Sequence, residues 1–122
     1  VFKQNGHYYM AYTANENIAI ATANSPLGPF KNEGKTLEAT VKQIDPFVFF
    51  DDGKVYLYHV RLTAGNRIFV AEMTEDLSAI KPETLKECIA AKETWENTTN
   101  AEWPVSEGPT VFRNAETYIM LY

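Results

Sequence analysis

The sequence predicts an all-β fold built from repeated antiparallel blades, and three observations lead to this fold class. Of the 122 residues, 45% are hydrophobic and 13% are aromatic, and aromatic residues favour β-strands. Three segments begin with Val-Phe, at Val1, Val48 and Val111, and each passes a polar turn into an aromatic-rich strand. Their starts lie 47 and 63 residues apart, a spacing typical of propeller blades with loop insertions. No stretch has the pattern of a long helix.

The first two of these segments predict tight hairpins. Val1–Thr13 turns at Asn5-Gly6, and Val48–Val60 turns at Asp52-Gly53. Both central positions of such a two-residue turn need a positive φ, which Asn, Asp and Gly tolerate. Each hairpin therefore supplies the first two strands of a blade, and the acidic pair Asp51-Asp52 is most simply explained by turn chemistry.

The third segment, Val111–Tyr122, carries a weaker turn signal at Asn114-Ala115 in the same phase of the repeat. It predicts the start of a third blade. The repeats together predict one partial propeller domain over residues 1–122, with blade one at 1–40, blade two at 41–90 and the start of blade three at 105–122.

The outer strands of each blade follow the hairpins. Third strands are predicted at Ile18–Ala23 and, after the turn Gly65-Asn66, at Arg67–Met73. Fourth strands are predicted around Thr36–Leu37 and at Leu85–Ala90. The segments between third and fourth strands are expected to be loops, at Asn24–Phe30 and Thr74–Thr84.

Charge and composition exclude several classes of function. The net charge is −5 and the 11 basic residues are scattered, so nucleic acid is not an expected partner, because a phosphate backbone is held by Lys and Arg clusters. No stretch is long and apolar enough to span a membrane. The single cysteine excludes an internal disulfide.

An acidic residue stands just before two of the aligned Val-Phe pairs. Asp45-Pro46 precedes Val48, and Glu107 precedes Gly108-Pro109 and Val111. The first strand of each blade lines the central channel of a propeller. The two acids are therefore expected at one mouth of that channel, and the matching position of blade one lies two or three residues before Val1.

Paired carboxyl groups in a pocket are what glycoside hydrolysis requires. One carboxyl must be protonated so that it can donate to the leaving oxygen, and another must be ionised so that it can activate water or attack carbon. Neighbouring like charges help to keep one of the two protonated near neutral pH.

These acids stand in runs that resemble glycoside hydrolase family 43. The similar runs are "QIDPFVFFDDGKVYLYHVRL", "VSEGPTVF" and "NIAIATANSPLGPF", and the resemblance covers nearly all of the chain. It implies a five-bladed propeller enzyme that removes arabinofuranose or xylose from plant cell-wall polysaccharide, with inversion. By this resemblance Glu107 is the general acid, and Asp45 tunes the pKa of the acid and holds it in position.

The same resemblance implies a third acid, the general base, in an Asp-Pro just ahead of Val1. The 122-residue chain is therefore not expected to hydrolyse substrate efficiently by itself. An inverting mechanism implies roughly 6.5–9.5 Å between the carboxyl groups of acid and base, which leaves room for water. Asp45 is expected to be extended, because it precedes Pro46, and Gly108 is expected to allow a close approach of backbone or substrate.

Three further residues are candidates for substrate binding: Phe47, Trp103 and Arg61. Phe47 follows Asp45 and either forms a wall of the subsite or packs in the core. Trp103 either stacks on a sugar or packs, whereas Trp95 is expected to be structural. For Arg61, a solvent-exposed side chain is a simpler interpretation than contact with substrate hydroxyls.

The sequence predicts no required cofactor. His59 is expected to be structural, no His, Cys and Asp spacing indicates zinc, and nothing in this segment supports a calcium ion in the channel. An extracellular or periplasmic location is expected for a parent enzyme that acts on cell-wall polysaccharide.

Two other functions stay open. One is a non-catalytic propeller fragment that binds carbohydrate or protein, although such a module has no need for Asp45 and Glu107 in phase. The other is a fructan-processing propeller, which is disfavoured because its acid is usually followed by Cys and Glu107 is followed by Gly108. Open blade edges also make self-association an expectation.

Overall fold

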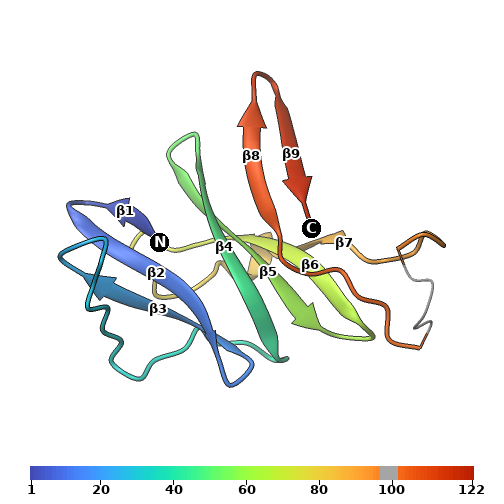
Figure 1. The fold of residues 1–122 in the computed structure, drawn as a ribbon, viewed down its shortest axis with the longest axis horizontal. Coiled ribbons are helices and arrows are strands. Elements are labelled where there is room, and N and C mark those ends of the chain that lie inside the picture. Colours follow the sequence, from blue (N-terminus) through green and yellow to red (C-terminus); the bar gives the residue numbers. More distant parts are fainter. Residues whose placement is uncertain (97–101) are drawn as a thin grey trace.

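The computed structural model describes residues 1–96 and 102–122 and arranges them as three antiparallel sheets (Figure 1). The sheets follow one another in chain order and hold three, four and two strands. Within the described ranges the one helical element is η1, the 3-10 turn Pro82–Thr84. No helix in this part of the chain is long and apolar enough to cross a membrane. The all-β prediction is confirmed.

The first sheet has the order β1-β2-β3. The predicted turn between its first two strands is confirmed, since Asn5 and Gly6 have φ angles of 47° and 82°, as a two-residue turn with two positive φ angles requires. The strands are β1 (Phe2–Gln4), β2 (His7–Ala14) and β3 (Asn17–Ala23).

The second sheet is a complete four-stranded meander of order β4-β5-β6-β7. Its first turn has Asp52 at φ 47° and Gly53 at φ 73°, so this predicted hairpin is also confirmed. The predicted third and fourth strands are both present. The strands are β4 (Gln43–Asp51), β5 (Lys54–Leu62), β6 (Asn66–Glu72) and β7 (Lys86–Ile89).

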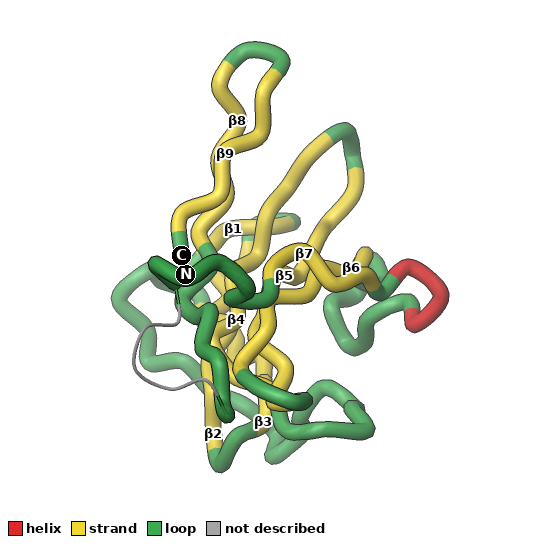
Figure 2. Tube along the Cα trace, turned by 90° about the vertical axis from the view of Figure 1, so that its right-hand side faces the viewer, coloured by secondary structure: helices red, strands yellow, loops and turns green. Residues whose placement is uncertain are grey.

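The third sheet is the hairpin of β8 (Thr110–Asn114) and β9 (Thr117–Leu121). Its predicted turn is wrong by one residue. Asn114 pairs with Thr117, so the turn residues are Ala115 and Glu116, and Ala115 has φ 52°. The strand pairing sets the register here, because the local turn signal is weak. In Figure 1 and Figure 2 the tips of the β4–β5 and β8–β9 hairpins extend in the same direction.

The fourth strand predicted for blade one does not form. The backbone of the outer segment bonds to β3 at the isolated bridge between Thr22 and Lys31 and from the Leu37 N–H to the Ile18 oxygen, without a continuous ladder. Asn32 is the physical reason. Its side chain donates to the Ile20 oxygen and a second carbonyl, and accepts from two backbone N–H groups, so it replaces a strand ladder with a local turn.

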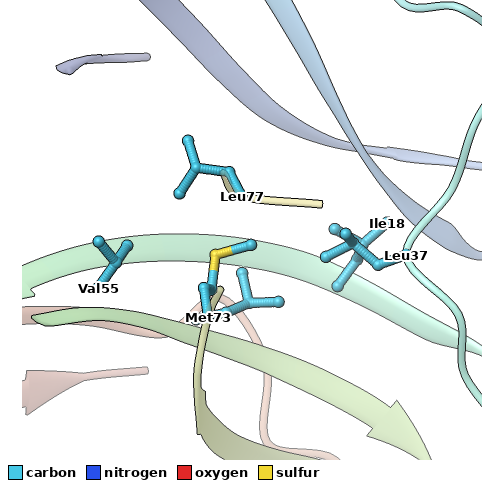
Figure 3. Packing of buried hydrophobic residues seen from close by; sticks show 6 residues of the cluster. Ile18, Leu37, Val55, Met73 and Leu77 are labelled. Atoms are coloured by element: carbon cyan, nitrogen blue, oxygen red, sulfur yellow. The ribbon is translucent and has the colours of Figure 1, made fainter. Parts of the chain in front are cut away.

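The hydrophobic core lies between the first two sheets. Its fully buried members come from β3, β5 and the loops that follow β3 and β6, and five of them converge in Figure 3. Burying each large aliphatic side chain contributes about 1.5–3 kcal/mol, so this core fixes blade one against blade two. The labelled residues are Ile18, Leu37, Val55, Met73 and Leu77.

Polar contacts near the hairpin tips join the second sheet to the third. Asp51 accepts a hydrogen bond of 2.6 Å from the Tyr118 hydroxyl and pairs with Arg113 at 3.2 Å. The Tyr118 ring also meets the Phe49 ring edge to face, with centroids 6.2 Å apart. Asp51 therefore links two sheets, and the interpretation of Asp51 as turn chemistry alone is wrong.

Candidate active site

Asp45 lies in a β-bulge at the start of β4. Ile44 pairs with Val60 and Phe47 pairs with Tyr58, so two residues of β4 face one residue of β5. Asp45 has φ 51°, and the expectation of an extended conformation before proline is wrong. The bulge imposes this angle, and Asp tolerates it better than most residues.

The backbone of Asp45 is held in this conformation from blade one. Its N–H donates to the Thr13 hydroxyl at 3.1 Å. A positive φ outside glycine costs of order 1–3 kcal/mol and persists only where the surroundings enforce it. The bulge and the Thr13 contact do so here, and they aim the carboxylate of Asp45 away from the ladder.

That carboxylate reaches the predicted start of blade three. The N–H of Gly108 donates to Oδ2 of Asp45 at 3.1 Å, across 63 positions of sequence. Gly108 directly follows Glu107 and has φ 61°. The structure therefore joins the carboxylate of Asp45 to the backbone amide of the residue that follows Glu107.

Glu107 is exposed to solvent but is not free to rotate. Its Oε1 accepts a hydrogen bond from Nδ2 of Asn66, whose side chain is buried, with 8% of the residue exposed. Glu107 therefore combines solvent access with a fixed direction, which suits a group that exchanges a proton with a bound molecule.

Asn66 also holds the backbone of the segment that carries Glu107. Its N–H donates to the Pro104 oxygen and its own oxygen accepts from the Ser106 N–H, both at 2.9 Å. Gly65 makes this approach possible, because a Cβ at this position would lie 2.5 Å from the Pro104 oxygen. Residues 104–106 thus run along the start of β6 as a parallel bridge.

Gly65 and Asn66 are the site residues that sequence reasoning missed. The pair reads as an ordinary turn signal ahead of β6. Nothing local indicates that a segment about 40 positions later packs on it, and only a conserved Gly-Asn in a set of relatives could have drawn attention to it.

Trp103 is adjacent to the site, and 40% of it is exposed. Its Nε1 donates to Oδ1 of Asn66 at 2.8 Å. Phe47 is half-buried on β4 directly after the bulge, which leaves both of its sequence interpretations open. Trp95 lies in a loop and is 72% exposed, so it does not pack in the core.

Arg61 is not the solvent-exposed side chain that the sequence suggests. It is buried, it donates to the Thr40 hydroxyl at 3.3 Å, and its guanidinium lies 5.5 Å from the centre of the Phe69 ring. Burial lowers the pKa of Arg61 from its ordinary value. These contacts hold the side chain of Arg61 inside the protein, and its binding to substrate stays a prediction.

His59 faces the core opposite the bulge and is fully buried. Burial lowers the pKa of His59 to about 4, so the ring is neutral near pH 7. Its Nδ1 lies 3.4 Å from the Leu57 oxygen. Over residues 1–96 and 102–122, no group of three or more His, Cys, Asp and Glu side chains is arranged to hold a metal ion.

The arrangement as a whole is one solvent-facing carboxyl group held by a buried amide, beside a second carboxylate that is tied to the next backbone N–H. Such a pair can offer a proton donor of defined direction to a molecule bound near the starts of β4 and β8. It cannot by itself activate a water molecule on the opposite side of a bound sugar, which requires a further base.

The whole chain, residues 1–122, matches the sequence profile described as "Glycosyl hydrolases family 43". Among curated proteins, a beta-xylosidase of Xylanibacter ruminicola is 31% identical over 91 residues, which is 70% of this chain and 27% of that protein. The chain thus spans about a quarter of the length of this relative.

Solved structures are similar in fold. An endo-1,4-beta-xylanase of Bacteroides thetaiotaomicron aligns with a TM-score of 0.82 at 44% identity, over 92% of this chain and 38% of that one. A thermostable family-43 glycoside hydrolase aligns with a TM-score of 0.79 at 32% identity, over 95% and 41%. An endo-arabinase of B. thetaiotaomicron, 18% identical, matches in fold with a TM-score of 0.77 over 98% and 47%. These matches confirm the partial propeller.

Proposed function

The chain belongs to glycosyl hydrolase family 43, and from this membership we propose that it forms part of the active site of an inverting glycoside hydrolase. The proposed substrate is plant cell-wall polysaccharide of the xylan or arabinan type. The observation that carries the proposal is the bond from the Gly108 N–H to Asp45, because it joins the two sequence-predicted acids in one site.

In the proposed reaction Glu107 is the general acid. Its proton passes to the glycosidic oxygen as the bond from that oxygen to the anomeric carbon breaks. A water molecule gives one proton to a base and adds to the anomeric carbon from the opposite face, so the products are a hemiacetal of inverted configuration and a free hydroxyl group. The exposed position of Glu107 supports this role, because the donor must reach the leaving oxygen.

Asp45 has the proposed role of orienting and tuning Glu107. Its Oδ2 fixes the amide of Gly108 at 3.1 Å, and this amide is one residue from the acid. The strained φ of Asp45 supports a functional origin, since backbone strain of this kind clusters at active sites.

The general base is proposed to lie in the part of the full-length protein that precedes Val1, on the first strand of blade one. The 122-residue chain alone is accordingly proposed to be inactive. No cofactor takes part in the proposed reaction.

The proposed sugar is xylose or arabinofuranose. The curated relative is described as a beta-xylosidase and the solved relative of 44% identity as an endo-1,4-beta-xylanase, which supports a xylan-type substrate first. A non-catalytic module that binds carbohydrate is the alternative, and the exposed Trp103 beside the acids is the observation that favours it.

The test uses the full-length protein that carries this chain. It is incubated with 4-nitrophenyl β-D-xyloside, 4-nitrophenyl α-L-arabinofuranoside and the corresponding oligosaccharides, and NMR records the first anomer released. We expect hydrolysis with inversion, and we expect Glu107→Gln to stop turnover of the oligosaccharides while they still bind. Binding without hydrolysis by the wild-type protein would favour the non-catalytic module, and retention of configuration would refute the mechanism.

A further inference from the structure

Asn66 makes hydrogen bonds with both its backbone and its side chain to one short segment of the chain. Its backbone N–H and oxygen bond to Pro104 and Ser106, and its side chain bonds to Trp103 and Glu107. All four bonds cross about 40 positions of sequence to residues 103–107. Fixing only the backbone of this segment would not need an amide side chain, so the side-chain bonds call for a separate explanation.

The two side-chain bonds settle which way the amide of Asn66 points. The indole Nε1–H of Trp103 can only donate, so the atom it meets at 2.8 Å must be the amide oxygen. The NH₂ group of Asn66 therefore faces Glu107. This assignment follows from donor chemistry and leaves no freedom for the amide to flip.

The orientation of Asn66 in turn decides which oxygen of Glu107 can carry a proton. Oε1 accepts the hydrogen bond from Asn66, and in a protonated carboxyl group the carbonyl oxygen is a better acceptor than the hydroxyl oxygen. The protonated form of Glu107 therefore carries its hydrogen on Oε2. The donating oxygen and its direction are both defined.

We propose that Asn66 is a positioning residue, which holds Glu107 so that Oε2 presents the proton to the leaving oxygen, and that the indole of Trp103 fixes Asn66 in the orientation this requires. The inference deepens the proposed function and rests on it, because it assigns the donating atom of the proposed general acid. Asn66 itself is not proposed to touch the substrate.

Burial and rigidity support a dedicated role. Asn66 is 8% exposed, its bond to Glu107 is partly buried, and shielding from water strengthens a hydrogen bond. The backbone bonds of Asn66 to Pro104 and Ser106 fix the register of the segment beside β6. A solvent-exposed glutamate would otherwise sample several rotamers, of which few would aim a proton at one point.

The test measures how turnover depends on the leaving group in the full-length protein. The main variant is Asn66→Asp, which keeps the size of the side chain and an acceptor for Trp103 but replaces the donor to Glu107 by an acceptor. A series of aryl xylosides or arabinofuranosides, graded by the acidity of the phenol, is compared with an oligosaccharide. General-acid assistance matters most for the poorest leaving groups.

For Asn66→Asp we expect kcat for the oligosaccharide to fall roughly ten- to hundredfold, with KM changed by less than about threefold. For the most acidic phenol we expect a change of less than about threefold. A plot of log kcat against leaving-group pKa should therefore be steeper than for the wild type. A purely structural defect would lower all rates by a similar factor.

The matched control is Asn32→Asp. The side chain of Asn32 also makes several hydrogen bonds, to Ile20 and to residues 34 and 35, and none of these bonds involves either acid. Its replacement should leave the leaving-group slope unchanged. If Asn66→Asp does not fold, Trp103→Phe serves instead, because it removes the indole donor that orients Asn66 and keeps an aromatic ring, and it should steepen the slope in the same direction.

The outcomes separate the two proposals. If Glu107→Ala steepens the slope but Asn66→Asp and Trp103→Phe do not, the positioning role is overturned and the proposed function stands. An equal effect of Asn32→Asp also overturns the positioning role. If the wild-type protein hydrolyses none of the substrates, or Glu107→Ala leaves the slope unchanged, the proposed acid is wrong and the role of Asn66 is overturned with it.

Discussion

Replacement of Gly65 by alanine should detach the segment that carries Glu107. Gly65 has φ 119°, and a Cβ added to it would lie 2.5 Å from the backbone oxygen of Pro104. An atom of the backbone cannot swing aside as a side-chain tip can. The segment that contains Pro104 must therefore move as a unit away from β6.

The cost can be worked out from the contacts that are lost. Alanine at a positive φ costs about 1–2 kcal/mol. Movement of Pro104 breaks the two backbone hydrogen bonds of Asn66, each of 2.9 Å, and each is worth about 1 kcal/mol. Gly65→Ala should therefore lower the free energy of unfolding by about 3–4 kcal/mol, a large part of the 5–15 kcal/mol typical of a folded protein.

Urea denaturation of the full-length protein measures this loss. The control is Gly53→Ala, because Gly53 also has a positive φ, 73°, but no atom lies within 4 Å of an added Cβ. The control should lose only the backbone contribution of about 1–2 kcal/mol. Equal losses in the two variants would refute the claim that contact with Pro104 is what requires glycine at position 65.

Three further predictions concern the acid, the core and the contact between sheets. Asp45→Asn keeps an acceptor for the Gly108 N–H, so the free energy of unfolding should change by less than about 1 kcal/mol. In the same variant kcat for oligosaccharides should fall at least about tenfold. An unchanged kcat would contradict the tuning role of Asp45. The pKa of His59 is lowered to about 4 by burial, so the unfolded chain, with an ordinary value of 6.5, takes up the proton first as the pH falls. The stability that neutral His59 contributes is therefore present above pH 6.5 and is lost towards pH 4. The loss in the free energy of unfolding is at most about 3 kcal/mol. Denaturation at both pH values should show this loss in the wild type but not in His59→Met. Asp51→Ala should cost about 1 kcal/mol through the bonds to Tyr118 and Arg113, and a double-mutant cycle with Arg113→Ala that gives strictly additive losses would exclude a coupling between them.

The sequence predicts those parts of the fold that depend on neighbouring residues. The hairpins at Asn5-Gly6 and Asp52-Gly53 are local, because residues that tolerate positive φ stand between alternating strands. The weaker signal at Asn114-Ala115 is displaced by one residue, because strand pairing sets the register where the turn residues do not.

The outer edge of blade one shows where local patterns fail. The residues around Leu37 are apolar enough for a strand, and Leu37 does bond to β3. Asn32, a few positions earlier, satisfies four backbone groups with its own side chain and turns the chain before a ladder forms. A propensity scale does not represent such competition.

The sequence predicts the two acidic residues of the candidate site but not the residues that hold them in position. Asp45 and Glu107 stand at similar distances ahead of matching Val-Phe pairs, which predicts that they lie at the same end of neighbouring blades. In the structure the N–H of Gly108, the residue after Glu107, donates to Asp45. The positive φ of Asp45 follows from a bulge that only the pairing with β5 defines. Gly65 and Asn66 act through contacts 40 positions away, for which the sequence of one protein gives no signal.

The most direct test of the account is whether Glu107 donates the proton. The full-length Glu107→Ala protein is compared with the wild type on two substrates. The first is a dinitrophenyl glycoside, whose phenolate leaving group departs without a proton. The second is an oligosaccharide, whose sugar leaving group needs a proton from the acid. We expect turnover of the oligosaccharide to fall on the order of 10²–10⁴-fold, while turnover of the dinitrophenyl glycoside changes by less than about tenfold. Equal losses on both substrates, or none on either, would contradict it.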